Sequence, residues 1–146
     1  MMKPIYVDHA ATTPMRIEVL EAMQPYMLEH FGNPSSVHGY GRRSREGLDT
    51  ARQLILSQLN AKKLGQLIFT SGGTEADNLA LFGVAKSRAH LGKHIITTVI
   101  EHHAVLHACQ QLEQEGFNVT YLPVGEDGRL QLSELEQALR EDTILV

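Results

Sequence analysis

Three short segments carry residue types that could bind a ligand or take part in chemistry. The first, residues 70–75, has the sequence Thr-Ser-Gly-Gly-Thr-Glu and lies between an apolar stretch and a helical pattern. A helix that begins here would present free backbone N–H groups and the positive end of its dipole. Two glycines allow close approach of a ligand, and Ser71 or Thr74 could add a hydroxyl donor. The segment therefore predicts a phosphate site, although a plain turn capped by either hydroxyl fits the residues about as well.

This segment matches neither of two common nucleotide-binding patterns. Thr74 and Asp77 stand where a dinucleotide-binding loop has glycines. No lysine follows Gly73, as a P-loop would require. We therefore expect a phosphate group, but not a dinucleotide or a P-loop nucleotide.

The second segment, Glu101-His102-His103, follows a predicted strand over residues 94–99. Ligands of open α/β sheets bind beyond the carboxyl ends of the strands, so one crevice would receive both the glycine turn and a flat imidazole. That combination suits a phosphorylated planar ring. His103 and His107 lie four residues apart on a predicted helix and could instead share a metal ion. The sequence offers no third ligand, so we expect no metal site.

The third segment is Asp8-His9-Ala10-Ala11-Thr12-Thr13-Pro14. Its small residues, hydroxyls and proline predict an irregular, tightly packed segment in which Thr13 caps the following helix. By itself the segment indicates no particular chemistry. Cys109 lies on the apolar side of its predicted helix, so we expect a buried structural thiol rather than a nucleophile.

The elements that must position these residues follow from hydrophobic periodicity. Helical patterns cover residues 16–30, 42–60, 75–91 and 103–115, and a further helix begins at Ser133, with Glu136 completing a capping box. Short apolar strands are expected at 67–70, 94–99, 119–124 and 143–146. Strands that alternate with helices predict a mostly parallel sheet with helices on both faces.

The expected architecture is thus a three-layer α/β domain preceded by an N-terminal helical segment. Residues 1–60 form that helical segment, and residues 61–146 form the first part of the α/β domain. The last predicted strand ends at Val146 without a covering helix. Because parallel strands are normally covered on both faces, we expect this domain to be truncated at its C-terminal end.

Composition excludes several classes of partner. The 146 residues carry a net charge of −4, which gives no electrostatic reason to expect direct contact with nucleic acid. No apolar run approaches the ~18 residues of a membrane span, so we expect no membrane partner. The single cysteine excludes an intramolecular disulfide and favours a reducing, cytoplasmic setting.

Taken in order, the motifs resemble the cysteine desulfurases of the class V aminotransferase group, which have the type I fold. The matching segments are residues 6–14, 31–36, 68–78, 95–98, 101–106 and 115–122. Each motif is modest, but together they cover essentially the whole chain in register. The resemblance implies that the α/β part belongs to the large domain of a pyridoxal-phosphate enzyme.

The resemblance also implies site residues by position. Gly73 and Thr74 match the residues that hold the cofactor phosphate, and His102 matches a histidine that stacks on the pyridine ring and can assist proton transfer. Ala11 and Thr12 match a segment on the substrate side. The implied enzyme converts L-cysteine to L-alanine and an enzyme-bound persulfide for iron–sulfur cluster or thiolated-RNA assembly. It is implied to be a homodimer that delivers sulfur to a scaffold or carrier protein.

Three groups that this chemistry needs have no match in the chain. The resemblance implies a Schiff-base lysine, an aspartate that pairs with the ring nitrogen, and a persulfide-forming cysteine on a mobile loop. None of the five lysines stands in the matching setting, and Cys109 precedes the expected loop. We therefore expect no desulfurase activity from this chain alone. Alternatives are another class V enzyme, such as a selenocysteine lyase or a kynureninase, and a non-catalytic module that binds a phosphorylated ligand or a complementary chain.

Overall fold

The chain forms two compact units, Met1–Ile68 and Phe69–Val146. The computed structural model describes residues 4–61 and 67–146. The domain boundary expected between residues 60 and 61 stays a prediction.

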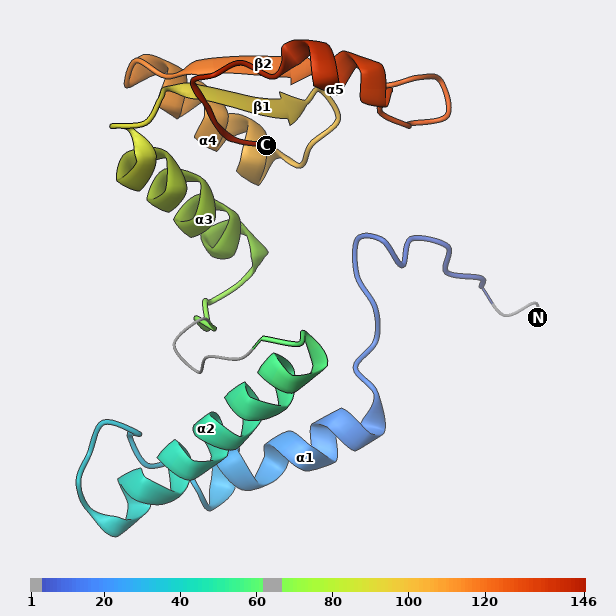
Figure 1. Ribbon diagram of the computed structural model, residues 1–146. Helices are drawn as coiled ribbons and strands as arrows, with labels where there is room; N and C mark the ends of the chain where they lie inside the picture. Colours follow the sequence, from blue (N-terminus) through green and yellow to red (C-terminus); the bar gives the residue numbers. More distant parts are fainter. Residues whose placement is uncertain (1–3, 62–66) are drawn as a thin grey trace. The chain divides into compact units, whose positions relative to one another are not determined.

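Within residues 4–61, the N-terminal unit has two helices, α1 (Ile17–Leu28) and α2 (Gly39–Gln58) (Figure 1). Both helical predictions are confirmed, although α2 begins three residues earlier than expected. Tyr26 of α1 packs its ring against Gly47 of α2, where a Cβ would clash with it. The Ser44 hydroxyl donates a 2.6 Å hydrogen bond to the carbonyl oxygen of His30, which ties the end of α1 to α2.

The segment before α1 differs from its prediction. Residues 4–14 are all exposed rather than tightly packed. The N-cap of α1 is Arg16, and no side chain caps the helix. Thr13 lies too far before Ile17 for its hydroxyl to reach the first free N–H groups, so the predicted cap is wrong.

The C-terminal unit is a three-layer α/β structure. Its strands β1 (His94–Thr98), β2 (Asn118–Leu122) and β3 (Thr143–Leu145) form a parallel sheet in the order β2-β1-β3. Its helices are α3 (Gly73–Arg88), α4 (His103–Gln114) and α5 (Leu132–Ala138). The predicted fold class, a parallel α/β sheet with helices, is confirmed.

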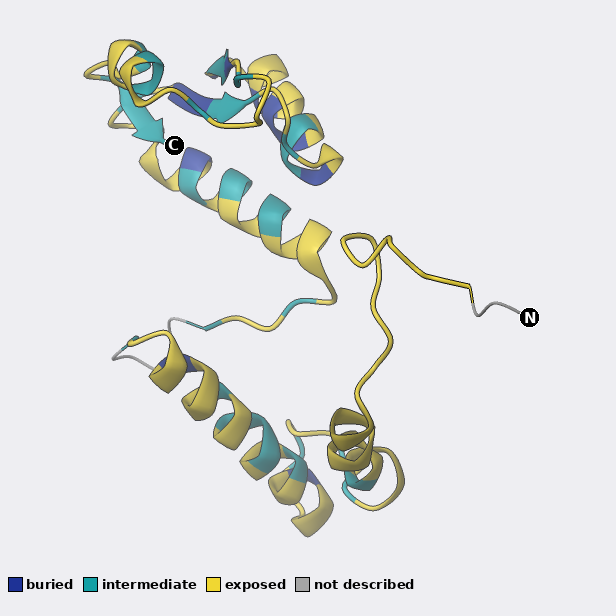
Figure 2. Ribbon diagram, turned by 90° about the vertical axis from the view of Figure 1, so that its right-hand side faces the viewer, coloured by how far each residue is buried: buried dark blue, intermediate teal, exposed yellow. Residues whose placement is uncertain are grey.

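Alternation along β1 explains how both faces of the sheet are covered. Ile95 packs with Ala85 of α3 and Leu112 of α4 on one face. Ile96 points to the other face, where it lines a small cavity with Leu135 of α5. Figure 2 shows buried residues gathered along β1 and on the inner side of α4, which is where the core of this unit lies. Cys109 is fully buried on α4, as predicted.

Two further predictions about local structure are wrong. Residues 67–70 form no strand, and Ile68 and Phe69 are largely exposed. An apolar tetrapeptide becomes a strand only by pairing with a neighbour, and the sheet of β1, β2 and β3 does not include it. The N-cap of α5 is Gln131 rather than Ser133, and it makes no side-chain cap. Ser133 already lies inside the first turn of α5, so its predicted capping box does not form.

Candidate functional site

The first part of the candidate site is the N-terminus of α3. The N-cap Gly72 is extended, with φ of 171° and ψ of 179°, and no side chain caps the helix. The expected alternative, a turn capped by the hydroxyl of Ser71 or Thr74, is therefore wrong. A Cβ placed on Gly72 or Gly73 would meet no atom within 4 Å, so the space around both glycines is open.

The side chain of Glu75 stabilises the turn before α3 by hydrogen bonds to Ser71. Its Oε2 accepts hydrogen bonds from the backbone N–H of Ser71 at 2.7 Å and from the Ser71 hydroxyl at 2.6 Å. These two bonds stabilise the carboxylate and lower the pKa of Glu75 below its ordinary value. The first N–H groups of α3 remain available to an anion, and the helix dipole favours one there.

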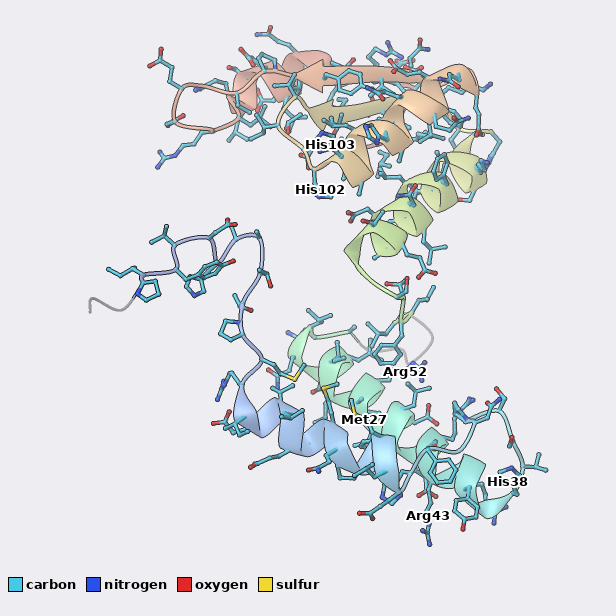
Figure 3. All side chains as sticks on the ribbon, turned by 180° about the vertical axis from the view of Figure 1, so that it is seen from behind. Met27, His38, Arg43, Arg52, His102 and His103 are labelled. Atoms are coloured by element: carbon cyan, nitrogen blue, oxygen red, sulfur yellow. The ribbon has the colours of Figure 1, made fainter. Side chains whose placement is uncertain are left out.

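The second part is the N-terminus of α4, where His102 is the N-cap. Its Nδ1 accepts a 3.1 Å hydrogen bond from the backbone N–H of Ala104. A ring nitrogen that accepts carries no proton, so the neutral ring bears its proton on Nε2. The loop between β1 and His102 is stabilised by a 2.9 Å hydrogen bond from the Thr98 hydroxyl to Oε1 of Glu101. Figure 3 shows His102 and His103 projecting from the start of α4.

The N-terminal ends of α3 and α4 both line one pocket of about 460 Å³. Thr74 and His102, two of the sequence-predicted residues, both line it. The other lining residues come from the same two helices: Asn78, Phe82, His103, Ala104, His107, Ala108 and Gln111. Gly73 adjoins Thr74 in the first turn of α3.

The two residues predicted to lie on the substrate side, Ala11 and Thr12, belong to the other unit. Ala11 and Thr12 are exposed, and their backbone N–H groups donate to the carbonyl oxygen of Asp8 at 3.1 and 3.3 Å. These bonds form a turn, and nothing about that turn identifies a ligand.

The histidines of the pocket give no metal centre by themselves. The rings of His103 and His107 lie 5.4 Å apart, centroid to centroid. Within residues 4–61 and 67–146, no three His, Cys, Asp or Glu side chains are grouped so that they could hold a metal ion.

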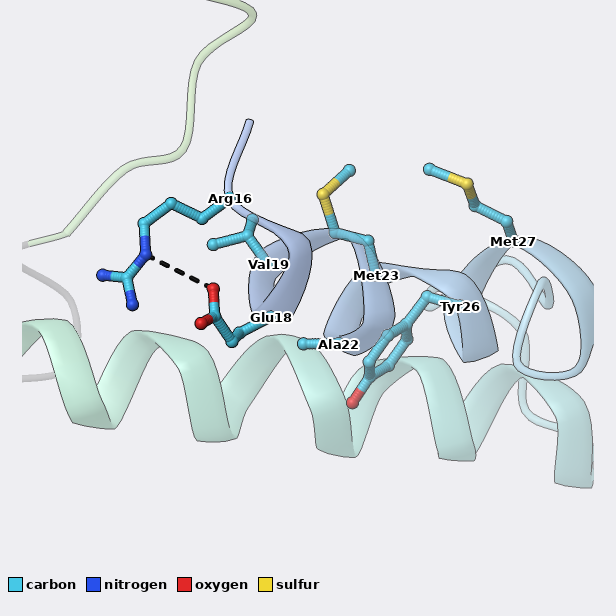
Figure 4. Close-up of a pocket in the computed structure, with 7 residues that line it drawn as sticks. All are labelled: Arg16, Glu18, Val19, Ala22, Met23, Tyr26 and Met27. Carbon is cyan, nitrogen blue, oxygen red and sulfur yellow. Dashed lines mark ion pairs between the residues drawn. The ribbon is translucent and has the colours of Figure 1, made fainter. Parts of the chain in front are cut away.

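A second, larger pocket of about 670 Å³ lies on α1 (Figure 4). It is lined mainly by apolar side chains such as Val19, Met23 and Met27, with an Arg16–Glu18 ion pair of 3.4 Å at one end. None of the predicted site residues lines it, so the pocket of α3 and α4 is the candidate site.

A family model described as aminotransferase class-V matches residues 5–146. The chain belongs to the class V aminotransferase family. Membership accounts for the parallel α/β architecture of the C-terminal unit.

Several relatives of this chain are named cysteine desulfurases. Cysteine desulfurase IscS of Dictyoglomus turgidum (strain DSM 6724 / Z-1310) is 51% identical over 146 residues, which are all of this chain and 37% of that protein. A solved NifS-like protein has a TM-score of 0.85 and 39% identity over 91% of this chain and 36% of its own. A second solved structure, SspA in complex with cysteine, has a TM-score of 0.84 and 38% identity over 92% of this chain and 39% of its own. The chain therefore spans little more than a third of these relatives.

The sequence analysis assigned no functional role to two residues that the structure places at or next to the site. Glu75 braces the turn before α3, and Asn78 donates hydrogen bonds to carbonyl groups of both helices. An asparagine in the interior of a helix has low helix propensity, and this is the one signal that could have drawn attention to Asn78.

Among the residues that the structure describes, no helix has the length and apolar character needed to cross a membrane.

Proposed function

We propose that this chain is the part of a cysteine desulfurase that binds the phosphate and ring of pyridoxal phosphate. The whole enzyme would convert L-cysteine to L-alanine and leave the sulfur on an enzyme cysteine as a persulfide. The observation that carries the proposal is the pocket shared by Thr74, at the open end of α3, and His102, at the start of α4. The names of the relatives, and the cysteine in one solved relative, favour cysteine over selenocysteine or kynurenine as substrate.

The start of α3 fits a phosphate group. Gly73 and Thr74 would bind the phosphate oxygens through backbone N–H groups, assisted by the Thr74 hydroxyl and the helix dipole. Glu75 is negative, but its Oε2 is hydrogen-bonded to Ser71 and is drawn toward the turn before the helix. Gly73 has no side chain, which lets a ligand approach the backbone closely.

His102 fits the aromatic part of the ligand. Its hydrogen bond with Ala104 restrains the ring, so a flat ligand could stack on it with little loss of side-chain freedom. Its Nε2 holds a proton that could be donated to a bound acceptor. Pyridoxal phosphate, when bound, supplies the electron sink for the reaction. We propose that Ala11 and Thr12 contribute to the substrate side in the whole enzyme.

We propose that the chain alone releases no sulfide from L-cysteine, because no lysine within residues 4–61 and 67–146 lines the pocket. Lys86 pairs with Glu115 at 3.2 Å and lies over the Phe82 ring, and Lys93 lies over the Phe117 ring. Neither lysine lines the pocket. Lys3, Lys62 and Lys63 lie outside the described residues.

The whole protein that we propose is a cytoplasmic homodimer. It would pass sulfur to a scaffold or carrier protein for iron–sulfur cluster or thio-cofactor and tRNA assembly, with no direct nucleic-acid contact. The support for these finer points is membership in the family and the single unpaired thiol, Cys109, which suits a reducing compartment.

Titration of the purified chain with pyridoxal phosphate, followed by absorbance, tests the proposal. Saturable binding is expected, and His102→Asn should weaken it because the variant removes the ring. Asparagine is itself a good N-cap, so the start of α4 should be preserved. His90→Asn, at an exposed histidine after α3, is the matched control and should bind like the wild type. Absence of binding by the wild type, or sustained sulfide release from L-cysteine, would contradict the corresponding part of the proposal.

A further inference from the structure

Asn78 occupies an unusual place in α3. It stands in the helix interior, where asparagine is less favourable than most residues because its amide competes with the backbone for hydrogen bonds. Its side chain is half-buried and lines the pocket that Thr74 and His102 share.

The amide of Asn78 bridges two helices. Its Nδ2 lies 2.8 Å from the carbonyl oxygen of Thr74 and 3.4 Å from that of Ala104. An –NH₂ group has two hydrogens, so it can donate to both carbonyls at once. Thr74 belongs to the open end of α3, and Ala104 is the residue whose N–H donates to the ring of His102. The bridge therefore contacts Thr74, which lines the site, and Ala104, which is hydrogen-bonded to the site residue His102.

The residues that α4 places next to the bridge are small. Ala104 and Ala108, which α4 contributes to this pocket, are small and buried, at 7% and 3% exposure. Small residues let helices approach closely, but they make few contacts that would define one spacing. A directional hydrogen bond across the pocket adds that definition.

We propose that Asn78 is a positioning residue that holds the phosphate-binding end of α3 and the His102-bearing end of α4 at one separation. The ligand named in this inference rests on the proposed function, whereas the coupling between the two helix ends does not. A pyridoxal phosphate molecule would contact both ends, so loss of the bridge should weaken its binding even where both ends remain folded.

The coupling is tested first without ligand, by comparing backbone amide NMR spectra of the wild type and Asn78→Ala. The resonances of Thr74 and Ala104 should both shift or broaden, although Ala104 lies 26 residues from the substitution. Asn118→Ala, at an exposed asparagine of β2, is the control and should leave both resonances unchanged. Changes confined to α3 would mean that Asn78 bonds only within its own helix, and they would overturn the inference.

Binding of pyridoxal phosphate then tests the positioning role. Loss of the bridge in Asn78→Ala should weaken binding by about tenfold, at a melting temperature close to that of the wild type. Asn78→Asp should weaken it more, because a carboxylate has no hydrogen to donate and would face two carbonyl oxygens. Wild-type binding that Asn78→Ala leaves unchanged overturns this inference alone. A wild type that does not bind overturns the proposed function, and the NMR comparison still decides whether the helix ends are coupled.

Discussion

Nδ1 of His94 lies 2.7 Å from the hydroxyl oxygen of Thr143, so the central strand β1 is joined to the edge strand β3 by side chains as well as by backbone. Nε2 of the same ring lies 2.8 Å from the hydroxyl of Thr120 on β2. His94 is fully buried. A single imidazole thus spans all three strands, with a partner for each ring nitrogen, as a buried polar group requires.

Thr143→Val should destabilise the C-terminal unit by about 1–3 kcal/mol, because it leaves a buried nitrogen of His94 unpaired. The same hydroxyl also accepts a 2.8 Å bond from the backbone N–H of Arg140, which would be lost too. Urea unfolding of the variant measures the change. Thr50→Val, at an exposed position of α2, is the control and should stay near the wild type. Equal stability of the two variants would contradict a structural role for the bridge.

Stability should also fall in mild acid because of His94. Burial lowers the pKa of His94 below 6.5, the nearby charge of Arg140 lowers it further, and Asp142 opposes the shift. The folded state then binds a proton less readily than the unfolded chain. The contribution of neutral His94 is complete above pH 6.5 and is lost as the pH falls from there through the folded-state pKa.

Unfolding free energies measured from about pH 7.5 to about pH 5 check this dependence. His94→Gln keeps a polar side chain but removes the titrating group, so its stability should vary less over that interval. A decline as steep as that of the wild type would assign the acid sensitivity to other groups.

Ser71→Ala should raise the pKa of Glu75 toward its ordinary value. The variant removes the hydroxyl bond, which is the largest cause of the lowered pKa, and keeps the bond from the Ser71 backbone N–H. Titration of the Glu75 carboxyl carbon by NMR gives the measurement. Ser133→Ala, on α5, should leave that titration unchanged, and a similar effect from both variants would exclude a specific Ser71–Glu75 contact.

Gly73→Ala should separate ligand binding from folding. A Cβ at this position meets nothing within 4 Å in the chain itself, so the melting temperature should not fall. In the first turn of α3 the added methyl group would crowd a phosphate that approaches the backbone N–H groups. Binding of pyridoxal phosphate should weaken about tenfold or more, and an unchanged affinity would count against Gly73 as a phosphate contact.

Gly41→Ala should destabilise the N-terminal unit by about 1–3 kcal/mol. Gly41 is buried, and a Cβ there would clash with the carbonyl oxygens of Ser36 and Asn33, which are backbone atoms of the loop before α2. Gly39→Ala is the matched control in the same helix, because its nearest atom would be the flexible Arg42 side chain at 4.0 Å. Thermal unfolding compares the two variants, and an equal effect would exclude close packing at Gly41 as the cause.

The order of the helices and three of the predicted strands could be derived from the sequence, because periodicity and turn chemistry act over a few residues. The strand predicted at 94–99 is β1, and the helix predicted at 103–115 is α4, which ends just before Gly116, a glycine with a φ of 89°. Strand formation at 67–70 and the cap at Ser133 could not be derived in the same way. Both depend on whether a neighbour or a helix start lies at the right place in three dimensions.

The motifs and the family resemblance identified Gly73, Thr74 and His102 as candidate residues before any geometry was known. Only the tertiary structure decided that Thr74 and His102 line one pocket and that Asn78 bridges the helices that carry them. The physical reason is sequence separation. Asn78 and Ala104 lie 26 residues apart, and His94 and Thr143 lie 49 apart, so these contacts arise from packing of the sheet and its helices rather than from local preference.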